Sequence, residues 1–593
     1  MSSPEAGTPD SEATEPPADD ATAPAAEGAT ADDTPGESAA PSRWRRFGAW
    51  WQRNITHFSY AGALVGTLLL WLSFTPSLLP RGPLFQGLVS GGSAAVGYMI
   101  GTFFAYLARY LISRKEPWRR AGTTAWSALG VVCAIGTAVM LYFYGRWQNE
   151  IRDLMGVAHS SWTAYPILVV VTVIAFTLLV VIGQLWGAGV RDLTRRLNRR
   201  VPPRISAVTA VAIAVVLTVF VVNGMVADYG MRALNSSFAA LNSESTPDSD
   251  PPTSNLRSGG PESKVSWKSL GRMGRAFVSS GPTTEQLTEF NGTPAKQPIR
   301  VYAGLESADG PLATAQLVVD ELERTGAFQR KLIGIGMTTG TGWINRSMPD
   351  SLEYMYNGDT AMASMQYSML PSWLSFLVDQ ERARQAGVAL FEAVDVRLRR
   401  IPEAQRPKVV VFGESLGSFG GEAPFGSMPT LLARTNGALF TGPTFSNTLW
   451  NDVTRNRQPG SPEWQPVYRY GDQVRFIADG GDLPRTDAAP HDTRMVYVQH
   501  ASDPISWWSP KLLFNKPDWL REKRGPDVLP ATRWIPVVTF LQVSADMAVA
   551  ANVPDGHGHT YLAAIPQAWA WILTPPGWTP EKTQRLIPKL TRS

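Results

Sequence analysis

The stretch from Lys408 to Glu422, KVVVFGESLGSFGGE, sets a serine between two glycines directly after a run of β-branched and aromatic residues. The run predicts a buried strand, and the small residues after the serine indicate the start of a helix. Gly413, Ser415 and Gly417 form the pattern G-x-S-x-G, whose sharp turn leaves no room for a Cβ on either side and lifts the serine hydroxyl above the sheet. The stretch therefore predicts a nucleophilic serine. A Gly/Ser turn that only packs is the alternative.

Strand-like runs alternate with helical patterns on both sides of this motif. The expected strands are 300–305, 331–337, 408–413, 437–442 and 494–499, and the expected helices include 311–325 and 379–400. This alternation favours a mostly parallel sheet with helices on both faces. We therefore expect an α/β catalytic domain over residues 265–593.

The first part of the chain has the pattern of a membrane protein. Five apolar stretches each reach the length of about 20 residues that a helix needs to cross a bilayer. They are 58–79, 88–112, 122–145, 164–187 and 206–228. We expect a five-helix transmembrane domain over residues 43–234.

Two polar segments flank that domain. Residues 1–42 hold ten acidic side chains and no Lys or Arg, which predicts a disordered tail and not a signal peptide. Residues 235–264 are a Ser/Pro/Asp/Gly mixture typical of an exposed linker.

Arginine placement predicts the orientation of the expected spans. Basic residues cluster before the first span, between the second and third, and between the fourth and fifth, whereas the alternate loops are poor in them; one carries Arg81 alone. The positive-inside rule then places the N-terminus in the cytoplasm of a multi-pass plasma-membrane protein. Because the number of expected spans is odd, we expect the catalytic domain on the outer face of the membrane. If one span were miscounted, the catalytic domain would lie in the cytoplasm.

Composition argues against several classes of function. The formal charge is +4, and arginines gather at the ends of apolar runs, which indicates membrane topology and not a nucleic-acid partner. Cys133 is the single cysteine, which excludes an internal disulfide and disfavours cysteine catalysis. Within the expected spans only Arg109 and Asp228 are ionisable, both at marginal depth, so a transporter or channel is the less favoured alternative.

A nucleophilic serine needs a base and an acid that orients it. With this motif the partners follow in the order serine, acid, histidine, so the base belongs near the C-terminus. The loop VPDGHGHTYL supplies His559, the preferred base, and His557, held in reserve.

Asp503, just beyond the expected strand 494–499, is the preferred acid, although an Asp-Pro turn is the simpler explanation. Asp546 and Asp555 are its rivals. His500 would pair with Asp503 or line the site.

An oxyanion site needs two backbone N–H donors. Leu416 follows the serine and supplies one, and Thr338 or Thr339, in the Gly-rich loop MTTGTGWIN, supplies the other. A phosphate cradle in this loop is disfavoured because the Lys-Ser/Thr ending is missing. A zinc site made from His500, Asp503, His557 and His559 would leave the serine motif unexplained.

With GESLG, TTGTGW, HASDP and DGHGHTY, the catalytic part resembles the α/β-hydrolase superfamily. Residues 58–590 look like an actinobacterial family of membrane-bound α/β-hydrolases with a multi-span N-terminal domain. The resemblance implies Ser415 as nucleophile, His559 as base and, less directly, Asp503 as acid. It implies neither cofactor nor metal.

We therefore predict a bilayer-anchored serine hydrolase or acyltransferase acting on an ester-linked lipid or cell-envelope substrate. Trp343, Trp507 and Trp508 would line an acyl groove or only pack. A catalytically dead, hydrolase-like binding module is the remaining alternative.

Overall fold

The computed structural model describes residues 58–112, 121–221, 224, 238–239, 241–244, 249–483 and 493–591. The expected tail 1–42 and Asp228 lie outside these residues. The described residues belong to one compact unit.

The catalytic part is built on a sheet of seven parallel strands in the order β1-β3-β2-β4-β5-β7-β6. The strands are β1 Ile299–Ala303, β2 Leu332–Met337, β3 Thr360–Met365, β4 Lys408–Glu414, β5 Gly437–Thr441, β6 Val474–Ile477 and β7 Met495–Val498. The predicted parallel sheet is confirmed. Two of its strands, β3 and β6, were not expected from the sequence.

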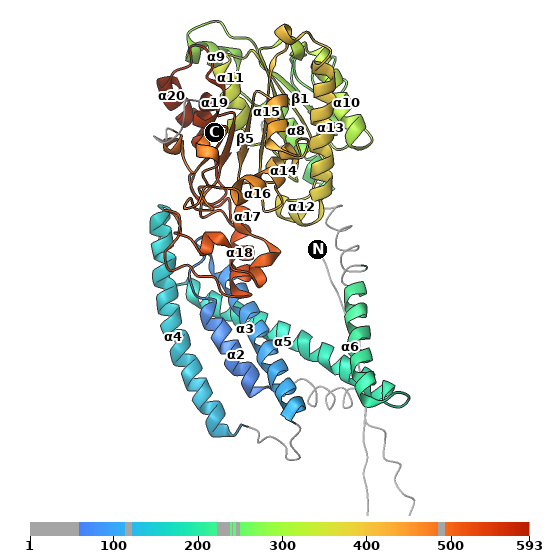
Figure 1. Ribbon diagram of the computed structural model, residues 1–593, viewed down its shortest axis with the longest axis vertical. Coiled ribbons are helices and arrows are strands. Elements are labelled where there is room, and N and C mark those ends of the chain that lie inside the picture. The colour runs from blue at the N-terminus through green and yellow to red at the C-terminus, as the bar shows by residue number, and fades with distance from the viewer. Residues whose placement is uncertain are drawn as a thin grey trace, which may run out of the picture. The chain divides into compact units, whose positions relative to one another are not determined.

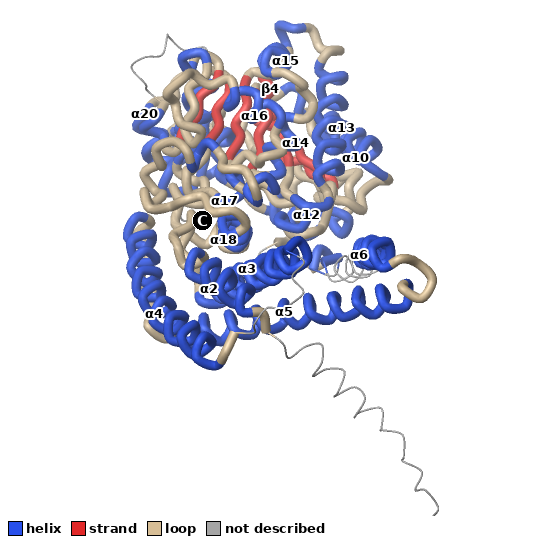
Figure 2. The backbone as a smooth tube through the Cα atoms, turned by 60° about the horizontal axis from the view of Figure 1, so that its bottom comes forward, coloured by secondary structure: helices blue, strands red, loops and turns tan. Residues whose placement is uncertain are grey.

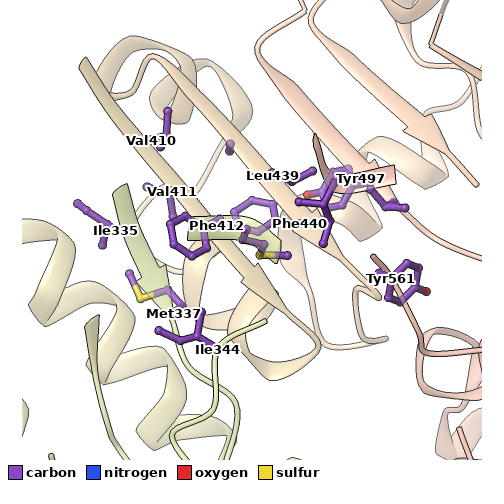
Figure 3. Close-up of a cluster of buried hydrophobic side chains, with 14 of the residues drawn as sticks. Ile335, Met337, Ile344, Val410, Val411, Phe412, Leu439, Phe440, Tyr497 and Tyr561 are labelled. Carbon is purple, nitrogen blue, oxygen red and sulfur yellow. The ribbon is translucent and has the colours of Figure 1, made fainter. Parts of the chain in front are cut away.

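The strand before the serine, β4, lies in the middle of the sheet. Val410 and Val411 are fully buried, as expected for a strand covered on both faces. Figure 3 shows Phe412 and Phe440 among the packed side chains of β4 and β5. Because β2, β4 and β5 run parallel, their carboxyl ends lie at the same edge of the sheet, which is where ligands usually bind.

Helices lie on both faces of the sheet (Figures 1 and 2). One layer contains α10, α13 and α14, and the other contains α11 and α19, with contacts inside each layer. The helices of this part are α8 Gly271–Ser279, α9 Thr284–Asn291, α10 Gly310–Arg324, α11 Ser347–Met355, α12 Ser372–Val378, α13 Gln380–Leu398, α14 Leu416–Glu422, α15 Met428–Arg434, α16 Thr448–Arg455, α17 Pro504–Trp507, α18 Val538–Met547, α19 Ala564–Leu573 and α20 Pro580–Thr591.

The first part of the described chain is helical. Its helices are α2 Tyr60–Leu72, α3 Pro83–Ile112, α4 Thr123–Leu154, α5 Ala164–Leu197 and α6 Pro203–Phe220. Within the described residues, four of them, α3 to α6, are long and apolar enough to cross a membrane.

The first expected span, 58–79, differs from the structure. Its helix α2 has 13 described residues and ends at Leu72, and the chain then turns before α3. The turn contains Pro76 and Pro80, and proline disfavours continuation of a helix because it lacks an N–H and clashes with the preceding turn.

Part of the expected linker packs against the catalytic part: Arg257 and Ser258 are buried, whereas Glu262 and Lys264 are exposed. The backbone of Arg257 pairs with that of Arg300 of β1 in an isolated parallel β-bridge, and Ser258 is fully buried. The Ser258 and Ser263 hydroxyls both donate to Glu321 of α10 at 2.9 Å. The serine-rich composition predicted exposure. Composition does not show that Glu321, distant in the sequence, accepts hydrogen bonds from these serines.

Candidate active site

Ser415 occupies a strained turn between β4 and α14. Its φ of 57° and ψ of −121° lie in a region that residues other than glycine rarely adopt. The Ser415 N–H donates to Thr441 O of β5 at 3.0 Å, and the Ser418 hydroxyl donates to Ser415 O at 2.6 Å. Strain held by neighbouring contacts is typical of functional sites.

The glycines of the motif permit this turn. A Cβ on Gly413 would lie 2.3 Å from Gly417 O, and one on Gly417 would lie 2.4 Å from Met337 O. Neither contact is possible for a real side chain, so β4, the serine turn and the end of β2 pack this closely only with glycine at both positions.

Asp503 and His559 come together at the same edge of the sheet. His559 Nδ1 lies 2.7 Å from Asp503 Oδ2. Asp503 follows β7 and caps the short helix α17, where its Oδ1 accepts the Ile505 N–H at 2.8 Å. Its Oδ2 also accepts the Tyr561 hydroxyl at 2.6 Å. These bonds fix the carboxylate and, through it, the orientation of the imidazole.

The serine turn and His559 share neighbours at the end of β5. A Cβ on Gly442 would lie 2.3 Å from His559 Cε1, so the imidazole packs directly against this glycine. Gly442 follows Thr441, whose carbonyl accepts the Ser415 N–H. Ser415 is 6% exposed and Asp503 is fully buried, so the site is largely closed to solvent.

Burial and charge act in opposite directions on the two titratable groups. Burial alone would lower the pKa of His559, but the adjacent Asp503 carboxylate and, to a smaller extent, Glu414 raise it above its usual value. Burial would raise the pKa of Asp503, yet His559 and the Tyr561 hydroxyl lower it overall. The pair therefore favours an ionised acid beside an imidazole of increased basicity.

The Gly-rich loop after β2 lies beside the serine turn. The Thr339 N–H donates to Trp343 O at 2.9 Å and is therefore already engaged. The Thr338 hydroxyl donates to Met365 O at 3.1 Å. Leu416 is the first residue of α14, where an N–H has no acceptor within the helix.

The two glycines of this loop approach other parts of the protein. A Cβ on Gly340 would lie 2.4 Å from Ser375 Cβ, and one on Gly342 would lie 2.6 Å from the Tyr302 hydroxyl oxygen. Both glycines therefore pack closely against the protein's own side chains.

The other candidate residues have different partners. His557 Nδ1 lies 3.7 Å from Asp527 Oδ2. His500 stacks on Tyr561 and its Nδ1 lies 2.9 Å from Gly558 O. Asp555 accepts the Leu562 and Ala563 N–H groups, and Asp546 pairs with Arg81. In the part of the chain that the structure describes, no group of three or more His, Cys, Asp or Glu is arranged to hold a metal ion.

The predicted tryptophans have different environments. Trp507 and Trp508 are buried, and Trp508 packs against Phe376, Phe445 and Phe540. Trp343 is 37% exposed. For Trp507 and Trp508, packing is therefore the role that the contacts support.

Three contributors to the site were missed in the sequence. The Tyr561 hydroxyl holds Asp503, and Gly442 makes room for His559. Asn345 Nδ2 donates both to Glu414, at 2.8 Å, and to Tyr561 O, at 2.9 Å. Tyr561 was visible as the aromatic residue of the histidine loop, but no local pattern marks Gly442 or Asn345.

A parallel sheet with a strained serine after its central strand defines the α/β-hydrolase class. Comparison with family models agrees: residues 299–586 match an alpha/beta-hydrolase family, and residues 74–282 match the N-terminus of an alpha/beta-hydrolase family. The chain belongs to this α/β-hydrolase family, with its N-terminal domain. No curated protein and no solved structure matches the chain.

Proposed function

We propose that this protein is a membrane-anchored serine hydrolase or acyltransferase that acts on an ester-linked lipid or cell-envelope substrate. Ser415 is the nucleophile, His559 the general base and Asp503 the acid that orients it. The observation that carries the proposal is the 2.7 Å contact between His559 and Asp503, beside a strained serine that shares the end of β5 with the imidazole.

In the proposed reaction, Ser415 Oγ attacks the substrate carbonyl carbon while His559 Nε2 accepts the hydroxyl proton. The Leu416 N–H and the Thr338 N–H stabilise the negative oxygen of the tetrahedral intermediate; Thr339 is less suitable because its N–H is engaged. Collapse of the intermediate releases the alcohol, which takes the proton from His559. Water or an acceptor hydroxyl then attacks the acyl-enzyme, with His559 again as base.

We place the catalytic domain on the outer face of the cytoplasmic membrane. Support comes from the two connections that are poor in arginine. Leu79 lies in the connection between α2 and α3, and Met155 lies in the connection after α4. Both residues belong to the hydrophobic core of the catalytic domain, so both connections lie on the same side as that domain. If α3 to α6 all cross, the Arg-rich segment between α5 and α6 lies on the opposite side, which the positive-inside rule assigns to the cytoplasm. The catalytic domain lies on the same face whether or not α2 crosses the membrane.

A lipid or envelope substrate is supported by tethering, because confinement at a membrane raises the local concentration of substrates held there.

An active-site fluorophosphonate probe tests the proposal on the full chain in nanodiscs. We expect wild-type protein to be labelled and Ser415→Ala to show no labelling. Ser446→Ala is the matched control, since its hydroxyl hydrogen-bonds to Gln380, and it should label like wild type. Folded wild-type protein without labelling would contradict catalysis and favour a binding module. If the wild-type protein is labelled, lipid profiling of a deletion strain identifies the ester that accumulates when the protein is missing.

A further inference from the structure

Residues 73–82 connect α2 to α3, and most of them are buried. This is unusual, because connections between helices normally run over the protein surface. Leu78 and Leu79 are 1% and 0% exposed, and both belong to the same hydrophobic cluster as the central strands of the sheet. The segment is therefore part of the core of the catalytic domain. We refer to residues 73–82 as the docking loop.

Helix α18 holds the docking loop through two side chains one turn apart. Asp546, fully buried, accepts hydrogen bonds from the Ser77 hydroxyl and, at 3.1 Å, from the Leu78 N–H. Its other oxygen lies 3.3 Å from Arg81 Nε. Gln542 Nε2 donates to Thr75 O at 2.8 Å. These contacts set the position of the loop relative to α18 (Figure 1).

The docking loop touches the segment that carries His559. A Cβ built on Gly558 would lie 3.4 Å from Leu79 Cδ2, so the Leu79 side chain lies against the residue between His557 and His559. Gly558 adopts a φ of 53°, and its N–H donates to the Ser502 hydroxyl at 2.8 Å. Leu79 therefore covers a tightly constrained turn next to the imidazole.

A second route joins the same elements. The segment after α18 supplies Ala550, whose carbonyl accepts the His559 N–H at 2.8 Å. A Cβ on Gly558 would also lie 2.6 Å from this carbonyl oxygen. The backbone of His559 is thus held by the segment that follows α18, and α18 is held by the docking loop.

We infer that the docking loop of the membrane half is a positioning element for the proposed catalytic histidine, acting through Leu79 on Gly558 and through α18 on His559. No hydrogen bond or ion pair of the described residues joins the loop to His559 or Ser415, so its effect is indirect. The inference rests on the proposed function only for the role of His559.

The test uses full-length protein in nanodiscs and compares Leu79→Ala with Leu168→Ala. Leu168 is the matched control because it is also a buried leucine that packs near the docking loop, against Tyr144 and against Phe74 at the α2 end of the loop, and it is not part of the contact between Leu79 and Gly558. Hydrogen exchange by mass spectrometry follows residues 556–561. We expect exchange there to rise at least about tenfold in Leu79→Ala and to stay at the wild-type level in Leu168→Ala.

Fluorophosphonate labelling gives the second readout. We expect the labelling rate to fall at least about tenfold in Leu79→Ala and less than about twofold in Leu168→Ala, with Leu79→Met restoring most of the rate. The pH midpoint of labelling, set by His559 among Asp503, Glu414 and Tyr561, should move to lower pH only in Leu79→Ala, because a looser turn weakens the contact with Asp503.

Unchanged exchange at residues 556–561 in Leu79→Ala would overturn the inference, as would equal effects of the two alanine variants. If wild-type protein is not labelled at all, the proposed function fails, whereas the exchange measurement still decides whether the loop positions the histidine turn.

Discussion

Tyr561 provides a strong hydrogen bond to the carboxylate of Asp503 in a fully buried setting. Hydrogen bonds to charged groups stabilise a fold more than neutral ones, by about 1.5–3 kcal/mol against about 1 kcal/mol. For Tyr561→Phe we expect the free energy of unfolding at neutral pH to fall by about 1.5–3 kcal/mol.

Tyr302→Phe is the control for this variant. Tyr302 is equally buried, but its hydroxyl donates to the neutral Gly342 carbonyl at 2.8 Å. Chemical denaturation in detergent should show a loss of only about 1 kcal/mol for Tyr302→Phe. Equal losses would mean that the charge of Asp503 adds nothing to this bond.

The pH dependence of acylation follows from the raised pKa of His559. Only the neutral imidazole accepts the serine proton, so the labelling rate should rise as pH increases through a midpoint above the ordinary value of about 6.5. In Asp503→Asn the counter-charge is lost while burial remains, so the midpoint should move to lower pH. The rate itself should fall about 10³- to 10⁴-fold, as expected when a base loses its orienting acid.

Fluorophosphonate labelling from about pH 5 to pH 9 measures both effects. A midpoint that stays in place in Asp503→Asn would show that Asp503 does not set the basicity of His559.

The sequence identified Ser415, Asp503 and His559 as a candidate set because a local motif, a strand end and a histidine loop each mark one residue. The structure brings Asp503 and His559 into contact. The engagement of the Thr339 N–H by Trp343 was invisible in the sequence, because it depends on how one loop folds back on itself.

At the level of elements, the end of β5 is as important as the serine turn. Gly442 has a φ of 52°, and a Cβ there would overlap the imidazole of His559. We expect Gly442→Ala to lower the labelling rate at least about 100-fold, since displacement of a catalytic group by about 1 Å can cost that much.

Gly577→Ala is the control for backbone strain, because Gly577 has a φ of 74° and no heavy atom within 4 Å of its Cβ position. This variant should lose some stability but keep the labelling rate. A comparable loss of rate in both variants would mean that strain, and not the overlap with His559, is responsible.

Strong hydrophobic runs such as KVVVFG were enough to locate the central strands. Strand β3, TAMASM, was missed because its alanines, serine and threonine resemble a loop or a helix, and only pairing with β1 and β2 makes it a strand. Strand β6 has four residues, too few for a clear period. Helix α2 was predicted too long because average hydrophobicity hid the two prolines that follow it.

For the molecule as a whole, the buried pair of Arg81 and Asp546 links the N-terminal helical part to the α/β-hydrolase part. Both side chains are fully buried. Removal of one partner leaves an uncompensated buried charge, which typically costs about 3–5 kcal/mol. We expect this loss for Arg81→Met in thermal or chemical unfolding of the full chain.

Arg196→Met is the matched control. Arg196 pairs with Asp192, but their side chains are 75% and 51% exposed, so the stability should change by less than about 1 kcal/mol. Little destabilisation by Arg81→Met would show that water or protonation compensates Asp546, the pKa of which is raised by burial despite Arg81.

Sidedness is testable with single cysteines in a Cys133→Ser background. Arg521 and Arg199 are both exposed, on the catalytic domain and between α5 and α6 respectively. A membrane-impermeant maleimide should label Arg521→Cys in intact cells and Arg199→Cys only after lysis. The reverse pattern would place catalysis in the cytoplasm.

The burial of Leu78 and Leu79 in the catalytic core has an evolutionary and a practical consequence. A gene fusion that replaced the first helices with an unrelated anchor would leave an apolar hollow beside α18, and secreted fragments that begin after the linker should aggregate. Across relatives, residues 73–82 and α18 should covary, so that neither half can be inherited or engineered as an independent module.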